Sequence, residues 1–218
     1  MKIVNRLFAQ AIRFGALAPA QGGQTVYGVN LVRAFEARYG FMESPKTVAE
    51  FDLSKGITFL HGFFDKRIVI DKFMIYNNGL VVETKDTTDV CVEIMSDVIK
   101  WGSEEAGVIF EENLMAPELY LSHLEVQSEI DLQAHSSKFQ TISAALNSYM
   151  ASYKEAGRDY KYSTMSFALD PSTGGPTTFQ FERRAKQPFS NNLYFSSAPL
   201  KSRDHESLLG VIESLFTS

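Results

Sequence analysis

The sequence predicts an α+β protein in which antiparallel or mixed sheets, built from hairpins, pack against about four to five helices. Two β-rich runs flank Asn77-Asn78-Gly79, and a regular alternation of apolar and polar residues follows Pro117. Helix-spaced apolar residues recur between these segments. Because strands come in groups and do not alternate singly with helices, we do not expect a doubly wound parallel sheet.

Length and composition set the broad class of the protein. The 218 residues are 44% hydrophobic and 22% charged, which suffices for a buried core and excludes a disordered or fibrous chain. The net charge of −5 argues against general nucleic-acid binding. No apolar run approaches the ~18 residues of a membrane-spanning helix. The single cysteine, Cys91, excludes an intrachain disulfide and, with the lack of glycosylation sequons, favours a cytoplasmic location.

Residues 2–17 are predicted to form a basic amphipathic helix. Lys2, Arg6 and Arg13 fall on one side of a helical projection. The first 35 residues carry +4, and the remaining 183 carry −9. Such asymmetry is typical of an interaction arm. The predicted interface consists of five apolar side chains on the other side of this helix: Ile3, Leu7, Phe8, Ile12 and Phe14.

The domain organisation follows from this arm. We expect an amphipathic arm over residues 1–22, joined by a linker over 18–24 to one α+β domain over 23–218. A subdivision of that domain near 133–137 is the alternative. A second helix over about 25–39 should end at Gly40.

The middle of the chain predicts a hairpin followed by a helix. The runs 67–76 and 80–85 should pair through a type I′ turn at Asn78-Gly79, which requires positive φ angles. Asp86 should cap the next helix, whose apolar residues recur at helical spacing up to a stop at Gly102. These residues are Val90, Ile94, Val98 and Trp101.

The strand expected over about 122–132 has one buried and one solvent-exposed face. Leu124 and Val126 should be buried, whereas Glu125, Gln127 and Glu129 should face water.

A capping box at Ser137-Lys138-Phe139-Gln140 begins a helix that extends to Gly157. Its apolar stripe consists of Phe139, Ile142, Leu146, Tyr149 and Tyr153. Short strands follow near 162–169, 177–184 and 192–198, and a final helix over about 203–216 packs through residues that include Leu215. The expected order is two helices, three strands, a helix, two strands, a helix, three strands and a helix.

No residue pattern identifies a catalytic, cofactor-binding or metal-binding site, so none is assigned. His61 with Asp65 could form an acid–base pair, but a loop histidine is the simpler interpretation. His123 and Glu125 share a strand face and could bind a cation, although a solvated face is favoured. His205 is interpreted as an exposed, neutral surface residue. Cys91 is interpreted as a core thiol and not a nucleophile.

Three classes of function remain open. A non-catalytic interaction or assembly protein, which binds itself or another protein, is favoured by the basic arm and the aromatic content. The first alternative is a hydrolase-like enzyme whose active-site residues are dispersed along the chain. The second is a peripheral membrane protein that docks through residues 2–17. No cofactor is expected for the favoured class.

Overall fold

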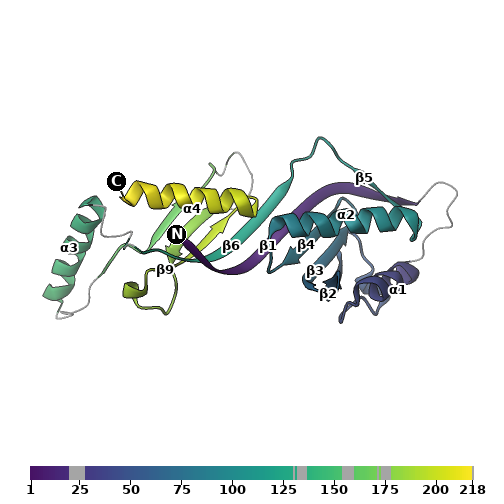
Figure 1. The fold of residues 1–218 in the computed structure, drawn as a ribbon, viewed down its shortest axis with the longest axis horizontal. Helices are drawn as coiled ribbons and strands as arrows, with labels where there is room; N and C mark the ends of the chain where they lie inside the picture. The colour runs from purple at the N-terminus through teal and green to yellow at the C-terminus, as the bar shows by residue number, and fades with distance from the viewer. Residues whose placement is uncertain are drawn as a thin grey trace. The chain divides into compact units, whose positions relative to one another are not determined.

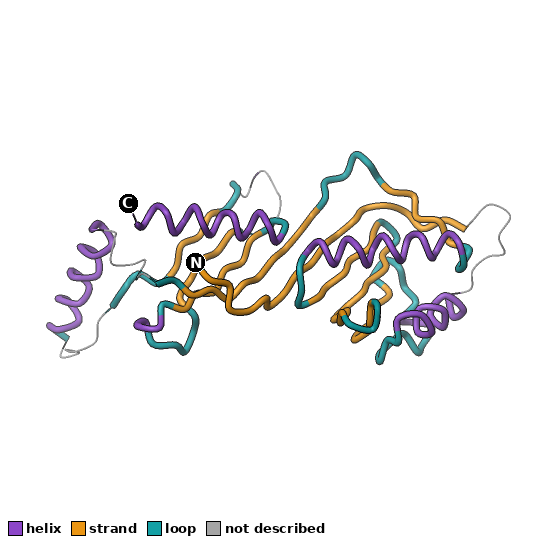
Figure 2. Tube along the Cα trace, viewed as in Figure 1, coloured by secondary structure: helices purple, strands orange, loops and turns teal. Residues whose placement is uncertain are grey.

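The computed structural model describes residues 1–19, 28–129, 131, 137–153, 160–170, 172 and 178–217 (Figures 1 and 2). Its helices are α1 (Gly28–Tyr39), α2 (Thr88–Glu104), α3 (Ser137–Ser152) and α4 (Ser202–Thr217). Its strands are β1 (Lys2–Pro19), β2 (Ile57–Phe64), β3 (Ile68–Tyr76), β4 (Gly79–Thr84), β5 (Val108–Glu112), β6 (Leu119–Gln127), β7 (Thr164–Phe167), β8 (Phe179–Arg183) and β9 (Leu193–Ala198). Among these helices and strands, the order differs from the expected one only at the first element, where a strand replaces a helix.

The strands form a large antiparallel sheet, which confirms the α+β class. They pair in the order β2-β3-β4-β1-β6-β9-β8-β7, and β5 pairs with β1. Every strand pairing with a described register is antiparallel. The sheet is larger than the separate hairpins that the sequence predicts.

The described chain divides into two compact units. Unit 1 contains the described residues of Met1–Asn5, His123–Ala198 and Arg203–Ser218, and unit 2 contains those of Arg6–Ser122 and Pro199–Ser202. The division into an arm over 1–22 and a domain over 23–218 stays a prediction. The expected linker over 18–24 and the alternative subdivision near 133–137 lie largely outside the described residues.

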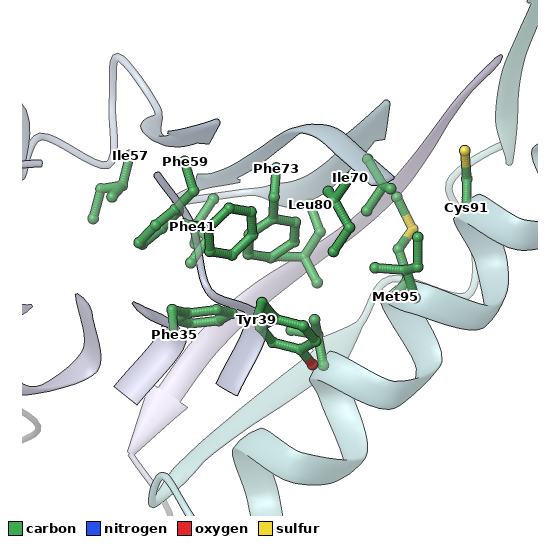
Figure 3. Packing of buried hydrophobic residues seen from close by; sticks show 14 of the residues in the cluster. Phe35, Tyr39, Phe41, Ile57, Phe59, Ile70, Phe73, Leu80, Cys91 and Met95 are labelled. Carbon is green, nitrogen blue, oxygen red and sulfur yellow. The ribbon is translucent and has the colours of Figure 1, made fainter. Parts of the chain in front are cut away.

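The core of unit 2 is a cluster of aromatic rings from four elements. Phe35 of α1 lies 5.1 Å from Phe59 of β2 and 5.2 Å from Phe73 of β3, measured between ring centroids. Trp101 of α2 meets Phe35 edge-on at 5.1 Å. Figure 3 shows Phe35, Phe59 and Phe73 packed together with Tyr39. The high phenylalanine content therefore serves this core in part.

The two helices expected in this unit are present. Helix α1 is followed by Gly40, whose φ of +61° suits the left-handed residue that ends many helices. Helix α2 buries Ile94 and Trp101 as predicted. Its N-cap is Thr87, one residue after the expected Asp86, and the Thr87 side chain accepts a hydrogen bond from the Val90 amide at 3.3 Å.

The amphipathic helix predicted over residues 2–17 is wrong, because Lys2–Pro19 is a single long strand. Residues Ala9–Phe14 pair with β4, and Gly15–Pro19 pair with β5. Ala9 and Ala11 are fully or almost fully buried. The apolar residues of this segment occur at odd and even positions alike, and such a run also fits a helical stripe.

The predicted β3–β4 hairpin is confirmed, but its turn differs from the expected one. Tyr76 pairs with Gly79, so Asn77 and Asn78 form the loop, and none of these residues has the positive φ of a type I′ turn. Glycine at position 79 fits a close approach instead: a Cβ there would lie 2.7 Å from the carbonyl oxygen of Arg13 in β1. Positive φ angles at two consecutive turn residues occur in the β2–β3 connection, at Asp65 (+50°) and Lys66 (+58°).

Unit 1 is built from the second half of β6, strands β7–β9, the start of β1, and helices α3 and α4. In β6, Leu124 and Val126 are buried and Gln127 is exposed, as the alternation predicts. Helix α4 buries Leu209 and Ile212, whereas Leu215, expected in the core, is exposed. No helix within the described residues is long and apolar enough to cross a membrane.

Candidate functional site

The structure does not bring His61 and Asp65 together as an acid–base pair. His61 lies within β2, between Leu60, which pairs with Lys72, and Gly62, which pairs with Ile70, and it has a φ of +56°. Asp65 lies in the exposed turn that follows β2. No hydrogen bond or ion pair joins these two described side chains, so the hydrolase alternative gains no support from them.

Cys91 is a core residue, as interpreted from the sequence. Its side chain is fully buried, and its Sγ donates a hydrogen bond to the Ala9 carbonyl oxygen at 3.5 Å. Burial raises the pKa of the thiol to about 12. The thiol is therefore neutral and inaccessible, which is unsuitable for a nucleophile.

Glu125 is buried, and its expected exposure is wrong. Only 9% of the residue is accessible. Its carboxylate accepts hydrogen bonds from Asn5 Nδ2 at 2.5 Å and from Arg184 Nε at 2.8 Å. The strand alternation correctly placed Glu125 on the face opposite Leu124 and Val126. It carried no information about Asn5 and Arg184, which lie 120 and 59 residues away in the sequence and cover this face.

His123 does not share a cation site with Glu125. Its ring meets Phe195 edge-on at 5.5 Å between centroids, and burial lowers its pKa. Both Glu125 oxygens are already hydrogen-bonded. Within the described part of the chain, no group of three or more histidine, cysteine or acidic residues is arranged to hold a metal ion.

His205 is fully buried in the first turn of α4, so the surface position expected from the sequence is wrong. Its Nε2 lies 2.8 Å from the Ser196 hydroxyl, and its ring meets Phe179 edge-on. Burial, with a smaller contribution from His123, lowers its pKa to about 4. The Ser196–His205 pair has the spacing of a nucleophile and its base, but both residues are inaccessible to a substrate.

Acidification should destabilise the chain through His205. Its ordinary pKa is 6.5 and its folded pKa is about 4, so between these values the unfolded chain binds the proton and the folded chain does not. The contribution of His205 to the free energy of unfolding is therefore fully present above pH 6.5. It falls as the pH drops, by roughly 2–3 kcal/mol near pH 4.5. Urea unfolding at several pH values should show this slope in the wild type and in His61→Asn. An equal slope in His205→Gln would show that another group causes it.

The α3 stripe is the most unusual feature of unit 1. The predicted helix is confirmed over Ser137–Ser152, but its apolar side chains face solvent. The α3 stripe consists of Phe139, Ile142, Leu146, Tyr149 and Tyr153, each between 40% and 71% exposed. No α3 residue whose burial is described is buried. The sequence predicted the stripe correctly but could not show that its five side chains are exposed.

A different side of α3 is half-buried. Ser143, Asn147 and Met150 are its half-buried residues, and they lie on a neighbouring side of the helix. Asn147 Oδ1 accepts a hydrogen bond from the Tyr160 amide at 2.7 Å. Phe139, at one end of the stripe, stacks on Tyr162 with ring centroids 4.4 Å apart. These contacts with residues 160–162 leave most of the α3 stripe exposed.

The five β1 residues predicted as an interface do not form one face. Strand alternation places Phe8, Ile12 and Phe14 on one side of β1 and Ile3 and Leu7 on the other. All five are half-buried. Their role as an interface stays a prediction. The helix over residues 2–17, on which both this interface and the membrane-docking alternative depended, is a strand in the structure.

Comparison with known proteins adds no family to this description. No protein-family model matches the chain, and no curated protein or solved structure matches it either. The functional argument therefore rests on the α3 stripe and the residues near it.

Proposed function

We propose that the chain is a non-catalytic assembly protein that self-associates through the α3 stripe. The observation that carries the proposal is the exposure of all five stripe residues. A helix of about 16 residues is only marginally stable in water by itself, and most helices in proteins are stabilised by burial of their apolar face. Large contiguous apolar patches on soluble proteins mark interaction sites.

The charge of this surface favours a second copy as the partner. No charged residue occurs from Phe139 to Tyr153, or from Tyr162 to Leu169, in a chain whose net charge is −5. Two such surfaces meet without repulsion. Nucleic acid and anionic lipid, by contrast, are bound through clusters of lysine and arginine, and these segments contain none.

The exposed apolar side chains of unit 1, taken together, have about the area of one side of a dimer interface. The stripe and two further exposed residues of the same unit, Phe167 and Leu169, are seven large apolar side chains. With roughly 150–250 Å² for a buried aromatic residue, their exposed parts amount to about 700 Å². A standard interface buries about 800 Å² on each partner.

The proposal is tested by the mass of the chain in solution. Ile142→Glu places a carboxylate in the stripe, and Ala144→Glu places the same group on the opposite side of the helix, where it is also exposed. Sedimentation velocity should show the wild type and Ala144→Glu above the 24.4 kDa of one chain. Ile142→Glu should raise the dissociation constant at least ~10-fold. Because Ile142 is 64% exposed, the thermal midpoint of the monomeric Ile142→Glu variant should differ little from that of the wild type.

Two results would contradict self-association through α3. The first is a wild type that stays at 24.4 kDa up to high concentration. The second is equal assembly of Ile142→Glu and Ala144→Glu.

A further inference from the structure

The contacts of His205 with β9 determine which of its ring nitrogens carries a hydrogen. The Ser196 hydroxyl donates a hydrogen bond to the Gln180 carbonyl oxygen at 3.1 Å, and His205 Nε2 lies 2.8 Å from the same hydroxyl oxygen. A hydroxyl has a single hydrogen, so both contacts are hydrogen bonds only if Nε2 carries a hydrogen and donates it to Ser196. The neutral imidazole of the folded protein is therefore the Nε2–H tautomer.

This tautomer leaves Nδ1 of His205 as an unprotonated nitrogen in the interior of unit 1. The residue is fully buried, and no described group hydrogen-bonds to Nδ1. The ring meets Phe179 of β8 edge-on, with centroids 6.3 Å apart. A second proton can bind only at Nδ1. There it would create a buried N–H without an acceptor and a buried positive charge without a counter-ion.

The charged and titratable groups near His205 do not compensate for that charge. On the sheet face that His205 contacts, Arg183 of β8 is itself a cation and is paired with Asp131. A charge on His123 of β6 would oppose protonation further. His205 lies in the first turn of α4, where the helix dipole also disfavours a cation. The neighbouring charged residues of α4 form no ion pair with the ring: Arg203, Asp204 and Glu206.

Helix α4 can leave its place without breaking the sheet. The helix, yellow in Figure 1, follows β9 after residues 199–201 and contributes no strand pair, whereas β8 and β9 pair with each other. Gly210 lies between the buried residues Leu209 and Ile212. A Cβ at Gly210 would meet no atom within 4 Å, so packing does not require this glycine, which disfavours the helix. Opening of α4 alone should therefore cost less than unfolding of the sheet.

We propose that His205 is an acid-operated switch: a proton bound at Nδ1 releases α4 from β8 and β9 while the strands stay paired. In the released helix, water solvates the imidazolium and both of its N–H groups. This inference is independent of self-association through the α3 stripe.

The size of the expected shift follows from the two states of the ring. Burial lowers the pKa of His205 to about 4, whereas the solvated ring keeps its ordinary value of 6.5. The released helix therefore binds the proton more tightly than the docked one. The ratio of released to docked helix should rise roughly 70-fold between pH 7.5 and pH 4.5.

Amide hydrogen exchange of the full chain tests the switch. Protection factors, which remove the pH dependence of the intrinsic exchange rate, should fall roughly 70-fold in α4 between pH 7.5 and pH 4.5. At pH 4.5 they should lie at least ~10-fold below those of β8 and β9, because the strands open only in global unfolding. Equal protection of α4 and the two strands at pH 4.5 would mean that α4 opens only with the whole chain, which overturns the switch.

His205→Gln is the matched variant, because its side-chain amide can donate to Ser196 but does not titrate. Protection of α4 in this variant should be nearly the same at both pH values. A pH-dependent loss as large as that of the wild type overturns the role of His205.

Nitrogen NMR of the wild-type imidazole tests the tautomer without any substitution. At pH 7.5, Nδ1 of His205 should give the signal of a bare ring nitrogen and Nε2 that of an N–H. The reverse assignment would place the free acceptor at Nε2 beside Ser196, and the switch would be overturned.

Discussion

Removing residues 1–17 should leave a chain that does not fold. The segment supplies most of β1, which lies between β4 and β6 in the strand order and also pairs with β5. Its loss removes the buried side chains of Ala9 and Ala11 and exposes the edges of the neighbouring strands. The expected loss exceeds the ~5–15 kcal/mol that stabilises a typical domain. Circular dichroism should show no cooperative thermal transition.

Two point substitutions distinguish a strand that belongs to the core from an N-terminal arm that the fold does not need. Ala9 is fully buried, whereas Ala16, in the same strand, is exposed. Ala9→Asp should therefore prevent folding, because it buries a carboxylate without a partner. Ala16→Asp should cost less than about 1 kcal/mol. A folded truncation, or equal tolerance of both substitutions, would instead support a separable N-terminal arm.

Replacing Glu125 by alanine should destabilise the chain about as much as a large core truncation. The change leaves Asn5 and the partly buried Arg184 guanidinium without the carboxylate that they share. Removing one partner of a buried ion pair costs about 3–5 kcal/mol, and the partial exposure of Arg184 reduces this to roughly 2–3 kcal/mol. Leu124→Ala, its fully buried neighbour, should cost roughly 2–5 kcal/mol. Chemical unfolding at pH 7 measures both losses.

Glu129→Ala is the control for this comparison. Glu129 is an exposed acidic residue just beyond the end of β6. Its replacement by alanine should lower the free energy of unfolding by less than about 0.5 kcal/mol. If Glu125→Ala costs no more than Glu129→Ala, the network with Asn5 and Arg184 contributes nothing to stability.

Local patterns were sufficient for the elements whose signal is contained in a few adjacent residues. The Asn-Asn-Gly turn located the β3–β4 hairpin, helical spacing located α2, and alternation assigned the buried face of β6. Each of these depends on the geometry of a single strand, helix or turn. Gly79 is instructive, because the residue was correctly tied to the hairpin but the reason for it lies in β1.

The errors arose where distant residues determine the environment. β1 is a strand because it pairs with β4 and β5. These partners lie far along the chain, so the local pattern of residues 2–17 does not indicate them. Glu125 and His205 are buried by partners elsewhere in the chain. The α3 stripe shows the converse: its pattern predicts burial, and the described chain supplies no cover for it.

Hydrogen exchange of α3 at several protein concentrations tests self-association through this helix most directly. If the stripe is covered by a second copy, the backbone amides of residues 139–152 should exchange slowly at high concentration. On dilution their protection should fall in step with the measured mass, while the amides of α2 stay protected. Exchange of α3 that is the same at every concentration, whether fast or slow, would contradict assembly through the α3 stripe.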